Sequence, residues 1–306
     1  MNFNEMQVIT ALAQIFAHPD AGVLVGIGDD AAVVKTTSES VITTDMAVEG
    51  THFNTAWCVA FDIGRKITAA NLADIYAMGA VPQYLVVALT LTGEESMEWI
   101  TDLAHGIHHE AASCKVAVVG GDLARGAIKV ISITAVGSVK KAVKRSGAQL
   151  GDLIYISSLP GWSGAGLSLI EGDDLDDLQA YAREQFCAPS VDYFAATAMA
   201  EAGATSMCDV SDGLITQASQ MADASQLCFS FDKSAFSADP EFVALNELAQ
   251  RCGVDVWQWI FAGGEDHVFL ATGRDLPGLC VGKVMQGCGT IGLEMKKTPD
   301  TWRHFL

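Results

Sequence analysis

The segment Val41-Ile42-Thr43-Thr44-Asp45 is an apolar run that ends in two hydroxyl residues and a carboxylate. Other short motifs also join Asp or Glu to Gly, Asn or a hydroxyl residue, and most of them adjoin apolar runs. They are Gly26-Ile27-Gly28-Asp29-Asp30, Asn71-Leu72-Ala73-Asp74, Gly120-Gly121-Asp122, Asp209-Val210-Ser211-Asp212-Gly213 and Gly263-Gly264-Glu265-Asp266. A carboxylate that follows a buried strand is held near the surface, where it can line a cleft. The pattern therefore predicts several strand ends that present acidic side chains.

The chemistry of these motifs favours a magnesium site. Carboxylate and hydroxyl oxygens are hard ligands of the kind that Mg2+ prefers. The sequence lacks the Cys and His spacing that a zinc site requires. Because Mg2+ commonly bridges a few carboxylates to substrate phosphates, the motifs predict a Mg2+-dependent phosphoryl-transfer enzyme.

The order of the expected elements favours an α+β fold with two domains. Helical spacing is expected over 62–78 and 94–112, and strands over 84–91 and 128–136. Strands and helices alternate irregularly in both halves, which is typical of α+β architecture. A chain of 306 residues favours two domains. The basic stretch 140–147 is the best boundary, so the domains are expected at 1–140 and 141–306.

The net charge of −19, from 37 acidic and 18 basic residues, argues against nucleic acid or an anionic membrane as a partner, because both polyanions would be repelled. The first residues, Met1 to Glu5, lack a cationic and then apolar pattern, so no secretory signal is expected. No apolar run approaches the roughly 20 residues of a membrane span. Eight cysteines without a C-x-x-C pair predict reduced thiols. We therefore expect a cytoplasmic protein.

Each motif also has a purely structural interpretation. Asp29 and Asp30 suit a Gly-flanked turn, and Asp45 suits an ordinary strand end. Gly120-Gly121-Asp122 would form a hairpin turn after the buried strand 116–119. Gly161 to Gly166 is expected to form a Gly-rich turn, and Gly287 to Gly292 a β-turn region.

Asp74 and Asp209 are harder to explain by local structure alone. Asp74 lies among apolar neighbours in an expected helix, where an unpaired carboxylate is costly, so either a metal ion or an ion pair with Arg65 or Lys66 is expected. Ser211 or Asp212 would cap the helix that begins near Leu214, which leaves Asp209 without a local role.

The motifs together resemble the thiamine-monophosphate kinase family in their order and spacing. The resemblance spans almost the whole chain and rests on residues 26–32, 43–53, 71–80, 120–126, 145–148, 209–214 and 263–266. It implies the fold of the aminoimidazole ribonucleotide synthetase superfamily, with two α+β domains and a dimer formed through the N-terminal sheets. It also implies the phosphorylation of thiamine monophosphate to thiamine diphosphate with MgATP, by direct in-line transfer.

The resemblance also implies a role for individual residues. The metal ligands that it implies are Asp30, Thr43, Thr44, Asp45, Asp74, Asp122, Asp209 and Asp212. It places Gly121, Asp122, Arg145 and Ser211 at ATP, and His52, Glu265 and Trp302 at the substrate. Asp45, Asp209 and Arg145 would serve the transfer itself. The chain departs from the family pattern at Thr43, Ala73 and Leu123-Ala124, and these changes keep the carboxylates.

Two other assignments remain open at this point. One is another ATP-using member of the superfamily, such as aminoimidazole ribonucleotide synthetase or selenophosphate synthetase. The latter normally has a Cys or selenocysteine followed by Lys near its N-terminus, whereas the first cysteine here is Cys58. The other is a cation or nucleotide sensor that keeps the scaffold without catalysis, although every matched position retains its oxygen donor.

Overall fold

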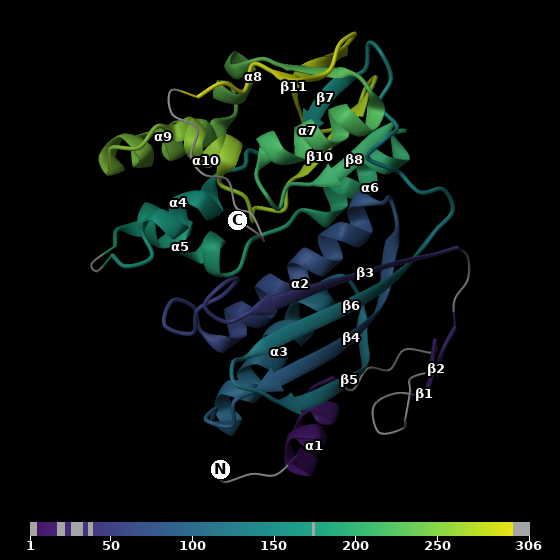
Figure 1. Cartoon of the computed structure of the whole chain (residues 1–306), viewed down its shortest axis with the longest axis vertical. Coiled ribbons are helices and arrows are strands. Elements are labelled where there is room, and N and C mark those ends of the chain that lie inside the picture. The colour runs from purple at the N-terminus through teal and green to yellow at the C-terminus, as the bar shows by residue number, and fades with distance from the viewer. Residues whose placement is uncertain (1–4, 17–21, 26–32, 36–38, 173–174, 296–306) are drawn as a thin grey trace. The chain divides into compact units, whose positions relative to one another are not determined.

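The structure, a computed structural model, describes residues 5–16, 22–25, 33–35, 39–172 and 175–295. Asp29, Asp30 and Trp302 lie outside these described residues. The chain divides into two compact units, residues 1–75 with 80–140 and residues 76–79 with 141–306 (Figure 1). Both units contain a sheet and helices, so the prediction of an α+β fold is confirmed.

The first unit is built around a four-stranded sheet (Figure 1). Its strands, in spatial order, are β3 (Glu39–Val48), β6 (Val130–Val139), β4 (Val81–Leu91) and β5 (Ala117–Arg125). β6 pairs antiparallel with β3 and β4, whereas β4 and β5 are parallel. The remaining elements are α1 (Glu5–Ile15), α2 (Ala60–Ala77), α3 (Met97–Ser113) and the antiparallel pair β1 (Val23–Val25) and β2 (Val33–Val34).

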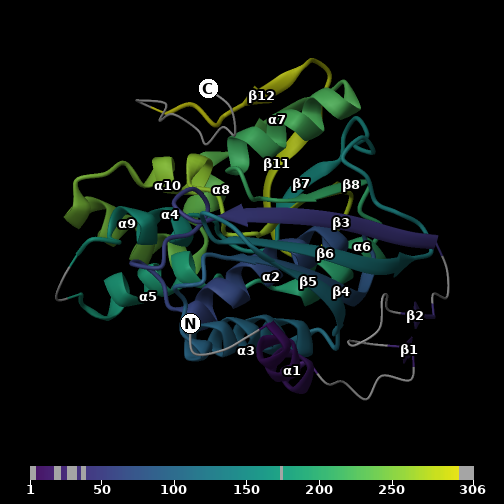
Figure 2. The same cartoon turned by 60° about the horizontal axis from the view of Figure 1, so that its bottom comes forward.

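The two faces of this sheet differ sharply. Figure 2 shows α2 and α3 on one face, and there Ile131, Ile133 and Ala135 of β6 are buried. On the opposite face, Ile42 and Met46 of β3 are 66% and 60% exposed. The sheet therefore has a helix-covered face and a face with exposed apolar side chains, which we call the open face.

β5 corrects one prediction. Gly120, Gly121 and Asp122 lie inside the strand, not in a hairpin turn after it. The pairing of β4 with β5 shifts register between Leu85 and Val86, and a Cβ added to Gly121 would lie 2.0 Å from the carbonyl oxygen of Val87. Glycine is therefore needed at Gly121 because the two strand backbones approach closely there.

The second unit contains a six-stranded sheet. Its strands, in spatial order, are β12 (Gly289–Ile291), β9 (Cys228–Phe231), β11 (Leu279–Met285), β7 (Leu153–Ile156), β10 (Phe269–Gly273) and β8 (Ser206–Asp209). All neighbours are antiparallel except β12 and β9. Its helices are α4 (Trp162–Ser168), α5 (Asp177–Cys187), α6 (Tyr193–Glu201), α7 (Leu214–Ser225), α8 (Lys233–Ser237), α9 (Pro240–Cys252) and α10 (Val256–Ala262).

Three further predictions are corrected in part or in full. The stretch Gly161–Gly166 is not a turn, because α4 begins at Trp162. The stretch 287–292 contains β12, which lies at the edge of the sheet. Six of the cysteines are free thiols as predicted, but the prediction is wrong for Cys58 and Cys187, which are disulfide-bonded.

Among the described residues, no helix is both long enough and apolar enough to cross a membrane.

Candidate active site

In the first unit, β3 and α2 bring four predicted polar residues together. Thr43 and Asp45 alternate to the same half-buried face of β3. Thr43 Oγ1 donates to Asp74 Oδ2 at 2.7 Å, and the backbone N–H of Asp45 donates to Asn71 Oδ1 at 3.2 Å. Asn71 and Asp74 lie three residues apart in α2, so they share one face as predicted. We call this group the strand–helix cluster.

The structure gives Arg65 and Asp74 each a polar partner in the first unit. Arg65 forms an ion pair with Glu110 of α3 at 3.2 Å, and the carboxylate of Asp74 accepts the hydroxyl of Thr43. The strand–helix cluster offers hydroxyl, carboxylate and amide oxygens and no sulfur. This donor set fits Mg2+, which prefers hard oxygen ligands.

Thr44 points away from the strand–helix cluster. Its side chain is exposed, its hydroxyl donates to the carbonyl oxygen of Ile133 at 3.1 Å, and it accepts from Thr134 at 3.1 Å. Adjacent residues of a strand project to opposite faces, so the hydroxyls of Thr43 and Thr44 do not meet on one face.

Asp122 is also separated from Asp45 by the sheet. Asp45 pairs with Ile133, which pairs with Val87, whereas Asp122 pairs with Ala88 in the next row. Residues in adjacent rows of a pleated sheet project to opposite faces. Asp122 is exposed and its side chain is directed to the open face, so the first unit does not bring Asp45 and Asp122 together on one face.

His52 lies in a tight turn that follows β3. Its backbone N–H donates to the carbonyl oxygen of Val48 at 2.9 Å, and its ring Nδ1 accepts from the backbone N–H of Val48 at 3.2 Å. Because Nδ1 accepts this bond, the neutral ring carries its proton on Nε2. The imidazole can therefore present Nε2–H as a hydrogen-bond donor.

In the second unit, the acidic segments 209–213 and 263–267 lie side by side. Glu265 N–H donates to the Ser211 carbonyl oxygen at 2.7 Å, and His267 N–H donates to that of Val210 at 3.2 Å. Gly264 has φ +70°, and a Cβ there would lie 2.5 Å from the carbonyl oxygen of Ser211. Only glycine satisfies both conditions without a shift of the chain. Ser211, Asp212 and Glu265 are thus brought together with Asp209.

Asp209 has a tertiary partner that the sequence did not suggest. It ends β8, is 2% exposed, and its Oδ2 lies 2.9 Å from His267 Nδ1. The expected cap at α7 is wrong, because Gly213 is the N-cap residue and no side chain caps the helix. Ser211 Oγ instead accepts from Gln217 Nε2 at 3.1 Å.

Asp266 holds the start of α4. Its carboxylate accepts the backbone N–H groups of Gly161 and Ser163, each at 2.9 Å. Burial raises the pKa of Asp266 from 3.8 to about 6, although the two backbone bonds act in the opposite direction. The sequence pointed to this motif but not to these partners, because the bonds join residues more than a hundred positions apart.

Arg145 lies beside α7. Its side chain is exposed, Nη1 donates to Gln220 Oε1, and its carbonyl oxygen accepts from Ser225 Oγ at 3.2 Å. The backbone of the preceding Lys144 forms an isolated parallel β-bridge with Ser206 at the start of β8. The basic stretch therefore follows the edge of the second sheet.

Within the described residues, no group of three or more His, Cys, Asp or Glu side chains is arranged to hold a metal ion. The predicted ligands that the structure describes fall into two sets. Thr43, Thr44, Asp45, Asp74 and Asp122 belong to the first unit, and Asp209 and Asp212 to the second.

Comparison with known proteins agrees with this architecture. The family description "AIR synthase related protein, N-terminal domain" matches residues 28–139. The thiamine-monophosphate kinase of Corynebacterium glutamicum is 35% identical over 301 residues, which cover 91% of this chain and 88% of the relative.

Solved structures give the same result. The crystal structure of thiamine-monophosphate kinase from Stenotrophomonas maltophilia K279a is 30% identical, with a TM-score of 0.81, and the match covers 94% of this chain and 95% of that one. A structure described as AaThiL complexed with AMPPCP and TMP shares the fold, with 24% identity, a TM-score of 0.81 and coverage of 100% and 99%. These similarities favour one family over the two synthetase alternatives. The chain belongs to the thiamine-monophosphate kinase family of enzymes.

Proposed function

We propose that this chain catalyses the ATP-dependent phosphorylation of thiamine monophosphate to thiamine diphosphate. The observation that carries the proposal is the strand–helix cluster, in which Thr43 bonds to Asp74 and the backbone of Asp45 bonds to Asn71. The similarity of the chain to thiamine-monophosphate kinases supports it. The related structure with AMPPCP, an ATP analogue, and TMP supports the choice of both ligands.

We further propose that the phosphoryl group passes directly from ATP to the phosphate of thiamine monophosphate. Phosphoryl transfer depends chiefly on alignment of the two reactants and on neutralisation of their charge. Bound Mg2+ would supply much of that neutralisation. Several ions are proposed, with Asp30, Thr43, Thr44, Asp45, Asp74, Asp122, Asp209 and Asp212 as ligands, and Thr44 and Asp122 do not share a sheet face with Asp45. Thr43 and Asp45 are already oriented by α2.

The remaining contacts belong to the same proposal. Gly121, Asp122, Arg145 and Ser211 would bind ATP, with the guanidinium of Arg145 offsetting phosphate charge during transfer. His52, Glu265 and Trp302 would bind thiamine monophosphate. The Nε2–H of His52 is a suitable donor for a phosphate or ring acceptor of the substrate.

We also propose a homodimer formed through the first unit. The open face carries Ile42, Met46 and Val86, which are 66%, 60% and 37% exposed. Burial of exposed apolar side chains is the usual driving force for association. In this arrangement residues 1–140 supply the dimer interface and part of the ATP and metal site, and residues 141–306 complete the active site. The cytoplasmic location stays a prediction.

Alanine variants of two carboxylates test the metal assignment. Asp45→Ala and Asp209→Ala should each lower kcat by about a thousandfold or more, because a ligand of the charge-neutralising metal is lost. Asp239→Ala is the control, since Asp239 is a half-buried cap of α9 and its loss affects stability only. Turnover is measured as thiamine diphosphate formed, and circular dichroism checks folding. Near-normal turnover in both variants would contradict the proposal.

The sensor alternative makes a different prediction for the same protein. A sensor would bind ATP without transferring its phosphoryl group. A single-turnover reaction with protein in excess over ATP separates the two, because the kinase converts bound ATP and thiamine monophosphate to ADP and thiamine diphosphate within one cycle.

A further inference from the structure

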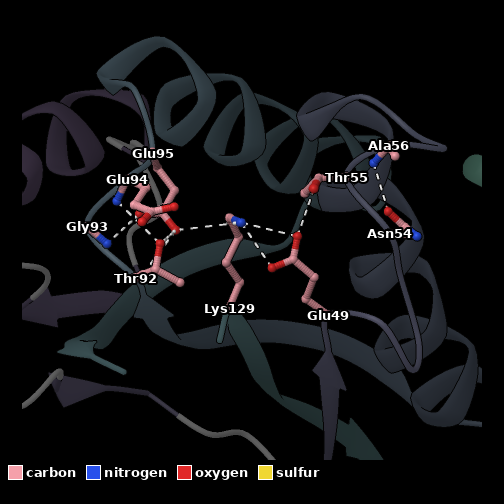
Figure 3. Close-up of polar contacts among 9 residues, drawn as sticks. All are labelled: Glu49, Asn54, Thr55, Ala56, Thr92, Gly93, Glu94, Glu95 and Lys129. Carbon is pink, nitrogen blue, oxygen red and sulfur yellow. Dashed lines mark hydrogen bonds and ion pairs between the residues drawn. The ribbon is translucent and has the colours of Figure 1, made fainter. Parts of the chain in front are cut away.

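A polar network clamps the turn that carries His52. The turn follows β3, and its backbone is closed by Gly50 N–H, which donates to the Phe53 carbonyl oxygen at 2.8 Å, and by His52 N–H, which donates to that of Val48 at 2.9 Å. Glu49 stands at its base. The carboxylate of Glu49 accepts the hydroxyl of Thr55 at 2.7 Å, which ties the two ends of the turn together (Figure 3).

Lys129 fixes Glu49 from the neighbouring strand. Its Nζ donates to both carboxylate oxygens of Glu49, at 3.1 and 3.0 Å, and its carbonyl oxygen accepts the backbone N–H of Glu49 at 3.0 Å. Main-chain and side-chain bonds therefore join the same two residues. Lys129 lies one residue before β6, so the turn is attached directly to the centre of the sheet.

Lys129 is itself held from its other side. Figure 3 shows its ammonium between Glu49 and Glu95, and Nζ lies 3.8 Å from Glu95 Oε1 and 5.7 Å from the centre of the Trp99 ring. The Glu95 side chain is 1% exposed. Its carboxylate accepts the backbone N–H groups of Thr92 and Gly93 at 3.0 and 2.8 Å.

Both carboxylates are stabilised in the charged form. Burial raises the pKa of Glu95, but the bonds from Thr92 and Gly93 outweigh burial and hold that pKa below its ordinary value. Burial likewise raises the pKa of Glu49, and the bonds from Thr55 and Lys129 reverse the effect. Lys129 thus meets two carboxylates that remain charged at neutral pH, and its position is fixed by both.

The pair of Lys129 and Glu49 is mostly shielded from solvent, with side chains 17% and 22% exposed. Its location has a consequence for the turn. Without the Lys129 side chain, Glu49 keeps only its backbone bond to residue 129, and the carboxylate at the base of the His52 turn loses its side-chain attachment. A less well-placed His52 would contact the acceptor more weakly in both the ground state and the transition state, which raises the KM for the acceptor and leaves kcat nearly unchanged.

We propose that Lys129 is a positioning residue, which acts through Glu49 to fix the turn that presents His52 to the phosphate-acceptor substrate. The proposal rests on the proposed function, because the contact of His52 with thiamine monophosphate is part of it. The ammonium of Lys129 is directed to the carboxylates of Glu49 and Glu95. Its effect should therefore appear in acceptor binding and not in the use of ATP.

The test compares Lys129→Met with Lys129→Arg, which keeps the charge. Arg65→Met is the matched control, because it breaks a comparable ion pair in the same unit, at 3.2 Å between side chains 20% and 7% exposed. Arg65 joins α2 to α3 and is no part of the turn. We expect Lys129→Met to raise the KM for thiamine monophosphate about tenfold, with kcat and the KM for ATP within about twofold of wild type.

Lys129→Arg should recover most of the affinity, and Arg65→Met should leave the KM for thiamine monophosphate unchanged. Amide hydrogen exchange at Gly50 and His52 gives a readout independent of activity, and it should accelerate in Lys129→Met alone. An unchanged acceptor KM in Lys129→Met, or an equal rise in Arg65→Met, would overturn the proposal.

The exchange measurement also separates this inference from the proposed function. If wild-type protein forms no thiamine diphosphate while exchange accelerates only in Lys129→Met, the proposed function fails and the clamp of the turn stands. If exchange at Gly50 and His52 is unchanged in Lys129→Met, the clamp is refuted whatever the activity.

Discussion

Asp266 should make the stability of the second unit depend on pH in a direction unusual for an acidic residue. The residue is buried, and its carboxylate accepts two backbone N–H groups. Burial raises its pKa from 3.8 to about 6. Between these two values the folded chain keeps a proton that the unfolded chain has released.

The sign follows from this difference in proton binding. Since the folded state binds more protons, the free energy of unfolding falls as the pH rises. The contribution is fully present below about pH 3.8 and is lost as the pH rises through about 6. A shift of about two pKa units corresponds to about 3 kcal/mol, at about 1.4 kcal/mol for each unit.

Asp266→Asn removes this dependence. The amide does not titrate, and it offers one acceptor where the carboxylate offered two, which costs about 1–3 kcal/mol at every pH. Urea unfolding followed by tryptophan fluorescence at pH 4.5 to 7 measures both effects. The wild-type free energy minus that of the variant should fall by about 2 kcal/mol across this range, because the range begins above the unfolded pKa of 3.8 and covers about 1.5 units of the shift.

Asp232→Asn provides a control of opposite sign. Asp232 is an exposed cap of α8, and the hydroxyl and backbone N–H of Ser234 hold its pKa below 3.8. Its contribution to stability is present above its unfolded pKa and is lost only in more acidic solution. The difference between wild type and this variant should therefore be flat from pH 5 to 7. Parallel profiles for wild type and Asp266→Asn would refute the reasoning about Asp266.

Two further variants test the crossing of segments 209–213 and 263–267. Gly264→Ala should destabilise the chain by about 2–4 kcal/mol, because Gly264 has φ +70° and the new Cβ would lie 2.5 Å from the Ser211 carbonyl oxygen. The control Gly253→Ala, at φ +66° with no atom within 4 Å, should cost only about 1 kcal/mol. Equal losses in thermal unfolding would contradict a steric cause. His267→Leu removes the hydrogen bond between Nδ1 and Asp209 and should lower the free energy of unfolding in urea by about 1–3 kcal/mol. His267→Asn keeps a donor near the Nδ1 position, so it should recover part of this loss. No recovery would mean that the packing of the ring matters more than the hydrogen bond.

The sequence was a good guide where local signals and tertiary structure agree. The expected helix 62–78 corresponds to α2 (Ala60–Ala77), and the expected strand 84–91 lies within β4. Apolar periodicity and a closing glycine are both local properties, so they can be recognised without the rest of the chain. The placement of Asn71 and Asp74 on one face followed directly from helical geometry.

The prediction of turns at glycines was wrong where a glycine lies inside a strand or helix and lets a neighbouring backbone approach closely. Gly120 and Gly121 suggested a turn, but β5 continues through them because β4 lies too close to Gly121 for a side chain. Gly164 and Gly166 similarly lie inside α4, where a Cβ on Gly166 would lie 2.1 Å from the Ala182 carbonyl oxygen. Such contacts arise from tertiary packing and leave no local signature.

The hydrogen-bond partners of the acidic side chains could not be predicted from the sequence. Asp209 bonds to His267 and Asp266 to the start of α4, across 58 and more than a hundred residues. The motifs marked the right segments, because glycines and carboxylates gather where segments cross. Which carboxylate oxygens accept hydrogen bonds from the protein depends on strand register and helix position. Short sequence motifs specify neither.

The central claim is that the chain transfers a phosphoryl group from ATP to thiamine monophosphate. The most direct measurement incubates the purified protein with both compounds and Mg2+ and follows thiamine diphosphate and ADP by chromatography, with EDTA as the control. The account predicts equal amounts of the two products, and none when EDTA removes the metal. ADP and inorganic phosphate without thiamine diphosphate, or transfer that EDTA does not affect, would contradict it.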